Sequence, residues 1–165
     1  MNTIFLTGFM GSGKSTIGRE LSNHLQLPVI DTDEQIERET GISIREIFST
    51  FGESYFRDLE SKTLFSLPTT NLIVTTGGGM VIRKENREWM RKNGTMVYLQ
   101  CDFDVIWSRL EHDQTRPLVV NSQKEQIKHL YLERQQYYEE NDFFIDTARP
   151  LQIVVEQLAQ MIKSE

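Results

Sequence analysis

The sequence predicts an α/β domain in which helices cover both faces of a mainly parallel sheet. Short apolar segments alternate with amphipathic helical segments along the whole chain. A glycine-rich segment also joins the first apolar strand segment directly to a helix. A length of 165 residues suits one compact domain. We therefore expect a single domain over 1–165.

The N-terminal part of the chain predicts two strands with one helix between them. The helix has a single apolar face because its apolar side chains recur every fourth residue. A strand–helix–strand unit of this kind places its two strands parallel in one sheet. The strand segments are Thr3–Thr7 and Leu27–Asp31, and the apolar helical positions are Ile17, Leu21 and Leu25.

The next part of the chain, 32–62, predicts short helices in place of the strand–helix alternation. Two capping-box patterns indicate helix starts, and a glycine is a suitable end for the first helix. We expect this segment to bind the substrate. The two boxes are Thr32 with Gln35 and Ser43 with Glu46, Gly41 is the expected end, and a longer helix through Phe56, Leu59, Thr63, Leu64 and Leu67 ends near Pro68.

The second half of the chain returns to the alternation of strands and helices. Only the polar segment 111–122 interrupts it, and we expect this segment to be a lid of about a dozen residues over the site. The expected strands are Leu72–Thr75, Met96–Leu99 and Phe143–Asp146. One expected helix is Lys84–Asn93, which ends at Gly94, and the next is capped by Asp102. A third begins at a capping box of Ser122 and Glu125, and the last begins at Pro150.

The glycine-rich segment Gly8–Ser15 matches the pattern G-x-x-x-x-G-K-S at every position. It lies between an expected strand and an expected helix, which is the context typical of a phosphate-binding loop. Backbone N–H groups and the positive end of the helix dipole bind phosphate oxygens there. A glycine-rich turn without a ligand is the alternative. The residues expected to bind ATP are Gly11, Ser12, Gly13, Lys14, which reaches the β- and γ-phosphates, Ser15, whose hydroxyl binds Mg²⁺, and Thr16.

Two aspartates, Asp31 and Asp33, follow the second expected strand. Ligands of open α/β sheets bind at the carboxyl ends of the strands. One carboxylate can hold Mg²⁺ through water, and the other can accept the proton of an attacking hydroxyl. The alternative is that Asp33 or Thr32 only caps the following helix.

Four arginines lie where phosphoryl transfer needs positive charge. The planar guanidinium group binds a carboxylate or a phosphate with two hydrogen bonds, so it can hold the acceptor or stabilise the transferred phosphoryl group. For three of them, Arg57, Arg109 and Arg134, a solvated surface charge is the main alternative. Arg116 lies in the expected lid and is therefore the strongest candidate for contact with the phosphates.

Three glycines, Gly77, Gly78 and Gly79, follow the third expected strand. Because glycine has no Cβ, this segment allows a ligand to approach the backbone closely. A tight turn at the strand exit is the alternative, although two glycines would suffice for it. We therefore expect the three glycines to contact the substrate.

Composition and charge exclude several classes of protein. The net charge of −6 argues against a broad nucleic-acid surface, and no apolar run is long enough to cross a membrane. Met1–Leu6 runs directly into a strand, without the features of a secretory signal. The single cysteine, Cys101, cannot form an internal disulfide. We expect a cytoplasmic protein that is a monomer and binds neither nucleic acid nor membrane.

Taken in order, these elements resemble the shikimate kinase family, within the group of kinases similar to nucleoside-monophosphate kinases. The resemblance extends over nearly the whole chain. The matching residues are Gly8–Thr16, Asp31-Thr32-Asp33, Ile47-Phe48 and Gly52-Glu53 before Phe56-Arg57, Thr76–Gly79, Thr115–Leu118, and Arg134 before Tyr138.

The resemblance implies a five-stranded parallel sheet in the order 2-3-1-4-5 and transfer of the γ-phosphate of ATP to the 3-hydroxyl of shikimate. It implies that Asp33 contacts that hydroxyl, that Asp31 holds Mg²⁺ through water, and that Arg116 closes over the phosphates. The remaining implied roles are a carboxylate clamp of Arg57 and Arg134 with the Gly78 backbone, ring contacts from Phe48 and Phe56, and an adenine border of Arg109 and Arg149.

Three alternatives remain at this point. A gluconate-type kinase also binds a carboxylate, but the Phe56-Arg57 pair and the three glycines argue against it. A nucleotide kinase needs room for a second base and usually has a longer lid. A nucleotide-dependent switch would carry an Asn-Lys-x-Asp segment for guanine, which the sequence lacks.

Overall fold

The computed structural model describes residues 1–112 and 123–164. A five-stranded sheet in the order β2-β3-β1-β4-β5 crosses the molecule, and every pair of neighbouring strands is parallel. The order that the resemblance implied is therefore confirmed. The strands are β1 (Thr3–Thr7), β2 (Val29–Asp31), β3 (Ile73–Thr75), β4 (Gly94–Gln100) and β5 (Phe143–Asp146).

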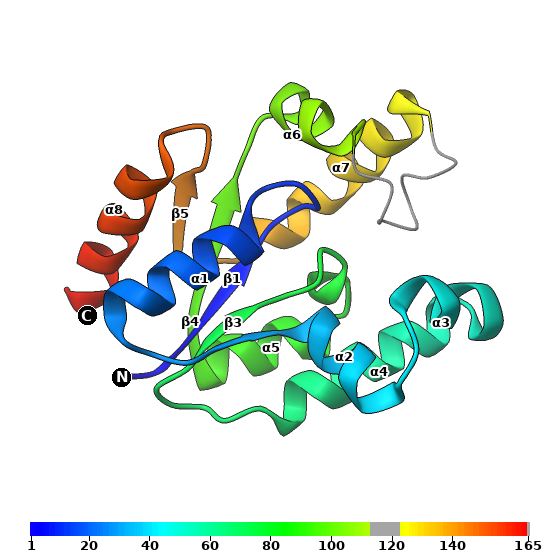
Figure 1. Cartoon of the computed structure of the whole chain (residues 1–165), viewed down its shortest axis with the longest axis horizontal. Coiled ribbons are helices and arrows are strands. Elements are labelled where there is room, and N and C mark those ends of the chain that lie inside the picture. The colour runs from blue at the N-terminus through cyan, green and yellow to red at the C-terminus, as the bar shows by residue number, and fades with distance from the viewer. Residues whose placement is uncertain (113–122, 165) are drawn as a thin grey trace.

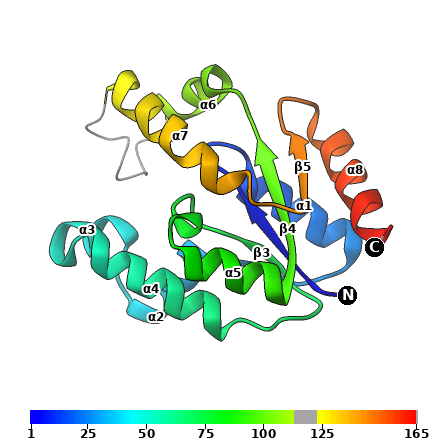
Figure 2. The same ribbon diagram turned by 180° about the vertical axis from the view of Figure 1, so that it is seen from behind.

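Helices connect the strands and cover both faces of the sheet. Helices α1 and α8 lie on one face (Figure 1), and α5 and α7 lie on the other (Figure 2). The helices are α1 (Lys14–Leu25), α2 (Thr32–Thr40), α3 (Ile44–Phe51), α4 (Glu53–Ser66), α5 (Lys84–Asn93), α6 (Phe103–Leu110), α7 (Lys124–Tyr138), α8 (Leu151–Lys163) and the short 3₁₀ helix η1 (Met80–Ile82).

The alternation of side chains along β1 divides the main core into two parts. Ile4 and Leu6 pack against α1 and α8, whereas Phe5 points to the face that α5 covers. All five residues of β1 are buried, as expected for the central strand of a parallel sheet covered on both sides. The sheet therefore forms a rigid support for the residues that follow its strands.

Helices α2, α3 and the start of α4 form a projection with a small core of its own (Figure 1). Ile36, Ile47 and Phe56 from these three helices are buried against one another. This projection corresponds to the segment 32–62, in which the sequence predicts substrate contacts. It stands beside the carboxyl ends of β2 and β3.

Two predicted helix starts differ from the structure. The N-cap of α2 is Asp31, not Thr32, because the Asp31 carboxylate accepts hydrogen bonds from the backbone of Asp33 and Glu34. The capping box of α7 is formed by Gln123 and Gln126, and the predicted partner Ser122 lies outside the described residues. The predicted cap at Ser43 is confirmed by its hydrogen bond from the Glu46 backbone.

Strand lengths also differ from the prediction at several ends. β2 begins at Val29, two residues later than predicted, and β4 begins at Gly94. Gly94 therefore ends α5 as expected but also opens the strand, in an extended conformation.

In the described part of the chain, no helix is both long and apolar enough to cross a membrane.

Candidate active site

The loop between β1 and α1 forms a cradle of backbone amides. Gly11 and Gly13 adopt positive φ angles of 78° and 95°, which glycine adopts without steric cost. Gly13 is the N-cap of α1, and no side chain caps that end of the helix. No capping side chain therefore stands between this loop and the positive end of the α1 dipole, which favours an anion there.

Two cationic side chains lie against this loop. The ammonium group of Lys14 donates to the backbone oxygens of Gly8 and Phe9, at 2.6 and 2.9 Å. Arg109 of α6 donates to the backbone oxygen of Gly11 at 2.9 Å. Both cations therefore lie within reach of phosphates held by the loop.

The carboxylate of Asp31 connects three elements at the carboxyl edge of the sheet. One of its oxygens caps α2, with N–O distances of 3.0 and 3.2 Å. The other oxygen accepts hydrogen bonds from the hydroxyls of Ser15 and Thr75, both at 2.8 Å. Asp31 therefore caps α2 and contacts the phosphate loop at the same time, whereas the sequence suggested Asp33 or Thr32 as the capping residue.

Two neighbouring cavities meet at Asp33. The first, of about 310 Å³ and here named the acceptor cavity, lies between the phosphate loop and the α2–α4 projection. The second, of about 200 Å³ and here named the phosphate cavity, is lined by the phosphate loop and Arg109. The residues that line both are Ser15, Asp31, Asp33, Gly77 and Gly78.

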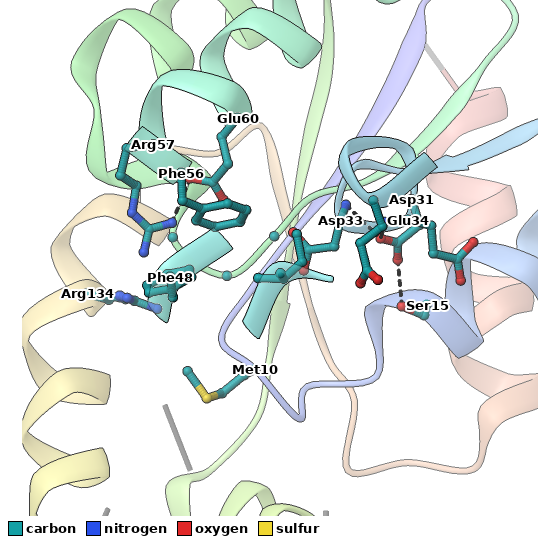
Figure 3. Close-up of a pocket in the computed structure, with 15 residues that line it drawn as sticks. Met10, Ser15, Asp31, Asp33, Glu34, Phe48, Phe56, Arg57, Glu60 and Arg134 are labelled. Atoms are coloured by element: carbon teal, nitrogen blue, oxygen red, sulfur yellow. Dashed lines mark hydrogen bonds and ion pairs between the residues drawn. The ribbon is translucent and has the colours of Figure 1, made fainter. Parts of the chain in front are cut away.

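Opposite charges lie on opposite sides of the acceptor cavity. Figure 3 shows Arg57 and Arg134 on one side and Asp31 and Asp33 on the other. The arginines come from α4 and α7, and both are buried. A ligand with a carboxylate at one end and a hydroxyl at the other therefore matches the charges of this cavity. The apolar lining comes from Met10, Ile44, Phe48 and Phe56.

Arg57 is held by two carboxylates of its own helix. Its guanidinium group contacts Glu60 at 2.6 Å and Glu53 at 3.1 Å. Burial raises the pKa of Glu60 to about 7, although the neighbouring Arg57 acts in the opposite direction. Burial also acts to lower the pKa of Arg57, but the two glutamates outweigh it and raise that pKa.

Arg134 has different surroundings. In the described part of the chain, no carboxylate lies within ion-pair distance of Arg134, and its guanidinium group stands over the ring of Phe9, 5.7 Å from the ring centre. Burial lowers the pKa of Arg134, and repulsion from Arg57 adds to the effect. An anion in the acceptor cavity could therefore pair with Arg134 without displacing a carboxylate of the protein.

The three glycines after β3 leave room for charged side chains. A Cβ atom on Gly77 would lie 2.8 Å from carboxylate oxygens of both Asp33 and Glu60. A Cβ on Gly79 would lie 2.2–2.4 Å from the guanidinium atoms of Arg57. The sequence predicts that a ligand comes close to the backbone here. The structure shows that charged side chains of the protein itself, Asp33, Glu60 and Arg57, also come close to it.

Replacing Gly79 with alanine is expected to weaken acceptor binding with little effect on the KM for ATP. The new methyl group must displace the Arg57 guanidinium, which is the flexible end of a long side chain, so the fold should tolerate the change. We expect the KM for the acceptor to rise about tenfold, the cost of losing one charge-assisted hydrogen bond. Steady-state kinetics with each substrate varied in turn measure this, and an unchanged acceptor KM would contradict it.

Most residues that the sequence predicts at the site line one of three adjoining cavities. The third cavity, of about 300 Å³, lies beyond the phosphate loop and is lined by Thr16, Arg109 and Arg149, among others. Arg149 itself donates to Gln157 at 3.3 Å, at the edge of this cavity. Arg116 and all but two residues of the predicted lid lie outside the described residues, so their roles stay predictions.

Glu60 is a site residue that the sequence did not indicate, and Glu53 was named only within the matching Gly52-Glu53 segment. Both lie on α4, three residues after and four residues before Arg57, which are the spacings that place side chains together on a helix. This spacing could have identified the ion pairs. It could not show that Glu60 is buried, because that depends on how α4 packs against α2 and the glycine segment.

The phosphate loop, the carboxylate beside it and the acceptor cavity with its two buried arginines together define an ATP-dependent phosphotransferase of the P-loop class. Residues 10–163 match the family model described as "Shikimate kinase". The chain belongs to the shikimate kinase family, and its activity is that of an ATP-dependent shikimate kinase.

Individual relatives agree with this assignment. The chain is 50% identical over 165 residues to a shikimate kinase of Bacillus cytotoxicus, covering 99% of this chain and 100% of that one. The fold matches shikimate kinase from Acinetobacter baumannii in complex with shikimate, with a TM-score of 0.93 and 34% identity over 99% and 94% of the two chains. A gluconokinase from Sinorhizobium meliloti, at 18% identity and a TM-score of 0.57 over 98% and 94% of the chains, shares only the fold.

Proposed function

We propose that the acceptor and phosphate cavities together carry out transfer of the γ-phosphate of ATP to the 3-hydroxyl of shikimate. The observation that carries this proposal is the position of Asp33, where the two cavities meet, opposite two buried arginines. In this arrangement Arg57 and Arg134 bind the carboxylate of shikimate, and the backbone at Gly78 assists them. Phe48 and Phe56 form an apolar wall for the ring.

Asp33 is proposed as the group that orients the attacking hydroxyl and accepts its proton. A base must lie within hydrogen-bond reach of the proton that it takes. Because the arginines fix the far end of the acceptor, the hydroxyl is presented at the Asp33 side of the cavity. Positioning of this kind is the main contribution of a protein to phosphoryl transfer.

The nucleotide is proposed to bind along the phosphate loop. The amides of Gly11–Thr16 bind its phosphates, and Lys14 exchanges its contacts with loop carbonyls for contacts with phosphate oxygens. Arg109 and Arg149 border the adenine, and Arg116 completes the positive charge around the transferred group. Support comes from the cavity that joins Thr16, Arg109 and Arg149.

The oxygen atoms at Ser15 and Asp31 fit a Mg²⁺ ion. Mg²⁺ prefers oxygen ligands and is usually bound by one or two protein groups, with phosphates and water completing its shell. The Ser15 hydroxyl lies 2.8 Å from the Asp31 carboxylate, and within the described residues no cluster of three or more acidic, histidine or cysteine side chains offers another site. Ser15 would bind the ion directly, and Asp31 through water. When bound, Mg²⁺ neutralises charge on the phosphates.

Replacing Ser15 with alanine is expected to raise the Mg²⁺ concentration needed for half-maximal activity. The substitution removes one metal ligand and leaves the Asp31 carboxylate with its bonds to Thr75 and the α2 backbone. We expect an increase of about tenfold or more. Titration of activity with Mg²⁺ at constant ATP measures it, and an unchanged requirement would remove Ser15 from the metal site.

The same proposal includes one kinase domain over 1–165, with 32–62 as the acceptor-binding segment and 111–122 as the lid. It also includes a monomer that acts in the cytoplasm on two small molecules, without nucleic acid or membrane. Sedimentation equilibrium of the purified protein tests the monomer.

A coupled assay of ADP release tests the proposed reaction. Shikimate, gluconate and AMP are offered separately with ATP and Mg²⁺. We expect rapid ADP release with shikimate only, and mass spectrometry should show one added phosphate on it. Release with gluconate or AMP in place of shikimate would reject the proposed acceptor.

A further inference from the structure

Glu60 is a buried carboxylate that borders the acceptor cavity and has no role in the reaction described above. Glu60 is 1% exposed and lines the acceptor cavity together with Asp33 and Gly77. One oxygen contacts Arg57, whereas the other, Oε1, has no hydrogen-bond partner in the described part of the chain. This oxygen and Asp33 Oδ1 are both 2.8 Å from the point where a Gly77 Cβ would lie. A buried polar atom without a partner is costly and calls for an explanation.

The charges around Glu60 balance only while the acceptor cavity holds no further anion. The charged groups that face it are Arg57 and Glu53 from its own helix, Asp33 from α2 and Arg134 from α7. Glu53 has a side-chain exposure of 57%, so solvent screens its charge. The remaining groups are two cations and two carboxylates, of which Arg57, Arg134 and Glu60 are buried and Asp33 is half-buried. A carboxylate that enters with the acceptor makes a third anion for two cations.

We infer that the acid acceptor binds together with uptake of one proton from solvent by Glu60. The new O–H bond forms on the Glu60 carboxylate, and no bond of the acceptor changes. Arg57 keeps its charge and now pairs with the acceptor's carboxylate in place of Glu60. The neutral Glu60 also gains an O–H donor, which Oε1 can direct into the cavity towards Asp33 or an acceptor oxygen. This inference rests on the proposed acceptor site and adds a positioning residue to it.

Two effects favour protonation of Glu60. Burial already raises the pKa of Glu60 to about 7, and a further anion nearby raises it more. In the protein without acceptor, Glu60 is then mostly protonated at about pH 6 and mostly ionised at about pH 8. Proton uptake on binding should therefore be small at about pH 6 and approach one at about pH 8, and affinity should fall as the pH rises above about 7.

Calorimetric titration of the whole protein with shikimate, without nucleotide, tests this inference. Titrations at about pH 8 in HEPES and in Tris, which differ in ionisation enthalpy, give the number of protons taken up from the difference in heat. We expect uptake close to one proton at this pH and close to none at about pH 6. Equal heats in the two buffers at about pH 8 would overturn the inference. This result needs no substituted protein.

Two substitutions assign the proton to its residue. Glu60→Gln keeps the shape of the side chain but cannot titrate, so it should abolish the uptake. Glu53→Gln is the matched control, because Glu53 contacts the same guanidinium but is exposed to solvent, and it should retain the uptake. Uptake that persists in Glu60→Gln would overturn the assignment. In the wild-type protein, infrared difference spectra should gain a band of a protonated carboxyl group when shikimate is added.

The proposed function and this inference fail in distinguishable ways. If shikimate gives no heat and no ADP release, the acceptor assignment is wrong and the inference falls with it. If shikimate is phosphorylated and binds with equal heats in both buffers, only the inference is wrong.

Discussion

Replacing Asp33 with asparagine is expected to lower the turnover number by about 10²-fold or more, the usual contribution of a positioned base. Asparagine keeps the size of the side chain but cannot accept the proton of the attacking hydroxyl. Because the arginines that bind the acceptor's carboxylate are unchanged, the KM for shikimate should change far less than the turnover number. Steady-state rates of ADP release at saturating ATP measure both constants.

Glu34→Gln provides the matched control for this substitution. Glu34 is the next residue of α2 and also lines the acceptor cavity, but its side chain is 59% exposed and pairs with Arg19 on the surface. It should retain near-normal turnover, since an exposed ion pair contributes little. Near-normal turnover in Asp33→Asn would reject the catalytic role of Asp33.

Replacing Arg134 with alanine is expected to lower kcat/KM for shikimate by about 10- to 100-fold, the cost of a lost hydrogen bond to a charged group. The KM for ATP should stay close to the wild-type value, because Arg134 lines the acceptor cavity and not the phosphate cavity. Arg134 is a cleaner test of the carboxylate clamp than Arg57. Loss of Arg57 would leave the buried Glu60 without its cation, which destabilises the fold as well as the site.

Arg91→Ala is the control for removing an arginine. Arg91 lies on α5, half exposed, and pairs only weakly with Glu140 at 3.4 Å. Its loss should leave both KM values unchanged. If Arg134→Ala raised the KM values for ATP and shikimate equally, the assignment of Arg134 to the acceptor would be wrong.

Local signals in the sequence were sufficient for most of the fold. The apolar segment Thr3–Thr7 and the phosphate loop after it form the central strand and the cradle as predicted. Strand ends were less accurate, since the ends of β2 and β4 depend on pairing with β3 and β1, which a single strand does not encode. The strand order came from the family resemblance, not from periodicity.

The site was predictable in its residue types but not in its internal contacts. Sequence spacing led to Asp31, Asp33, Arg57 and Arg134, and the structure brings all four to the acceptor cavity. The family resemblance implied that both arginines bind the carboxylate of the substrate. The structure shows that Arg57 is already bound to Glu60, a contact that arises because packing buries one side of α4.

The fit between the glycine segment and the charged groups has a consequence for how this enzyme can diverge. A side chain at Gly77 or Gly79 would meet atoms of Asp33, Glu60 or Arg57, so these positions suit glycine. A larger residue at either glycine would displace the end of the facing side chain and weaken the acceptor site, unless that side chain had shortened. Descendants that adopt a different acceptor should therefore change both sides of this contact in concert, and substitutions at the glycines should be found paired with shorter residues opposite them.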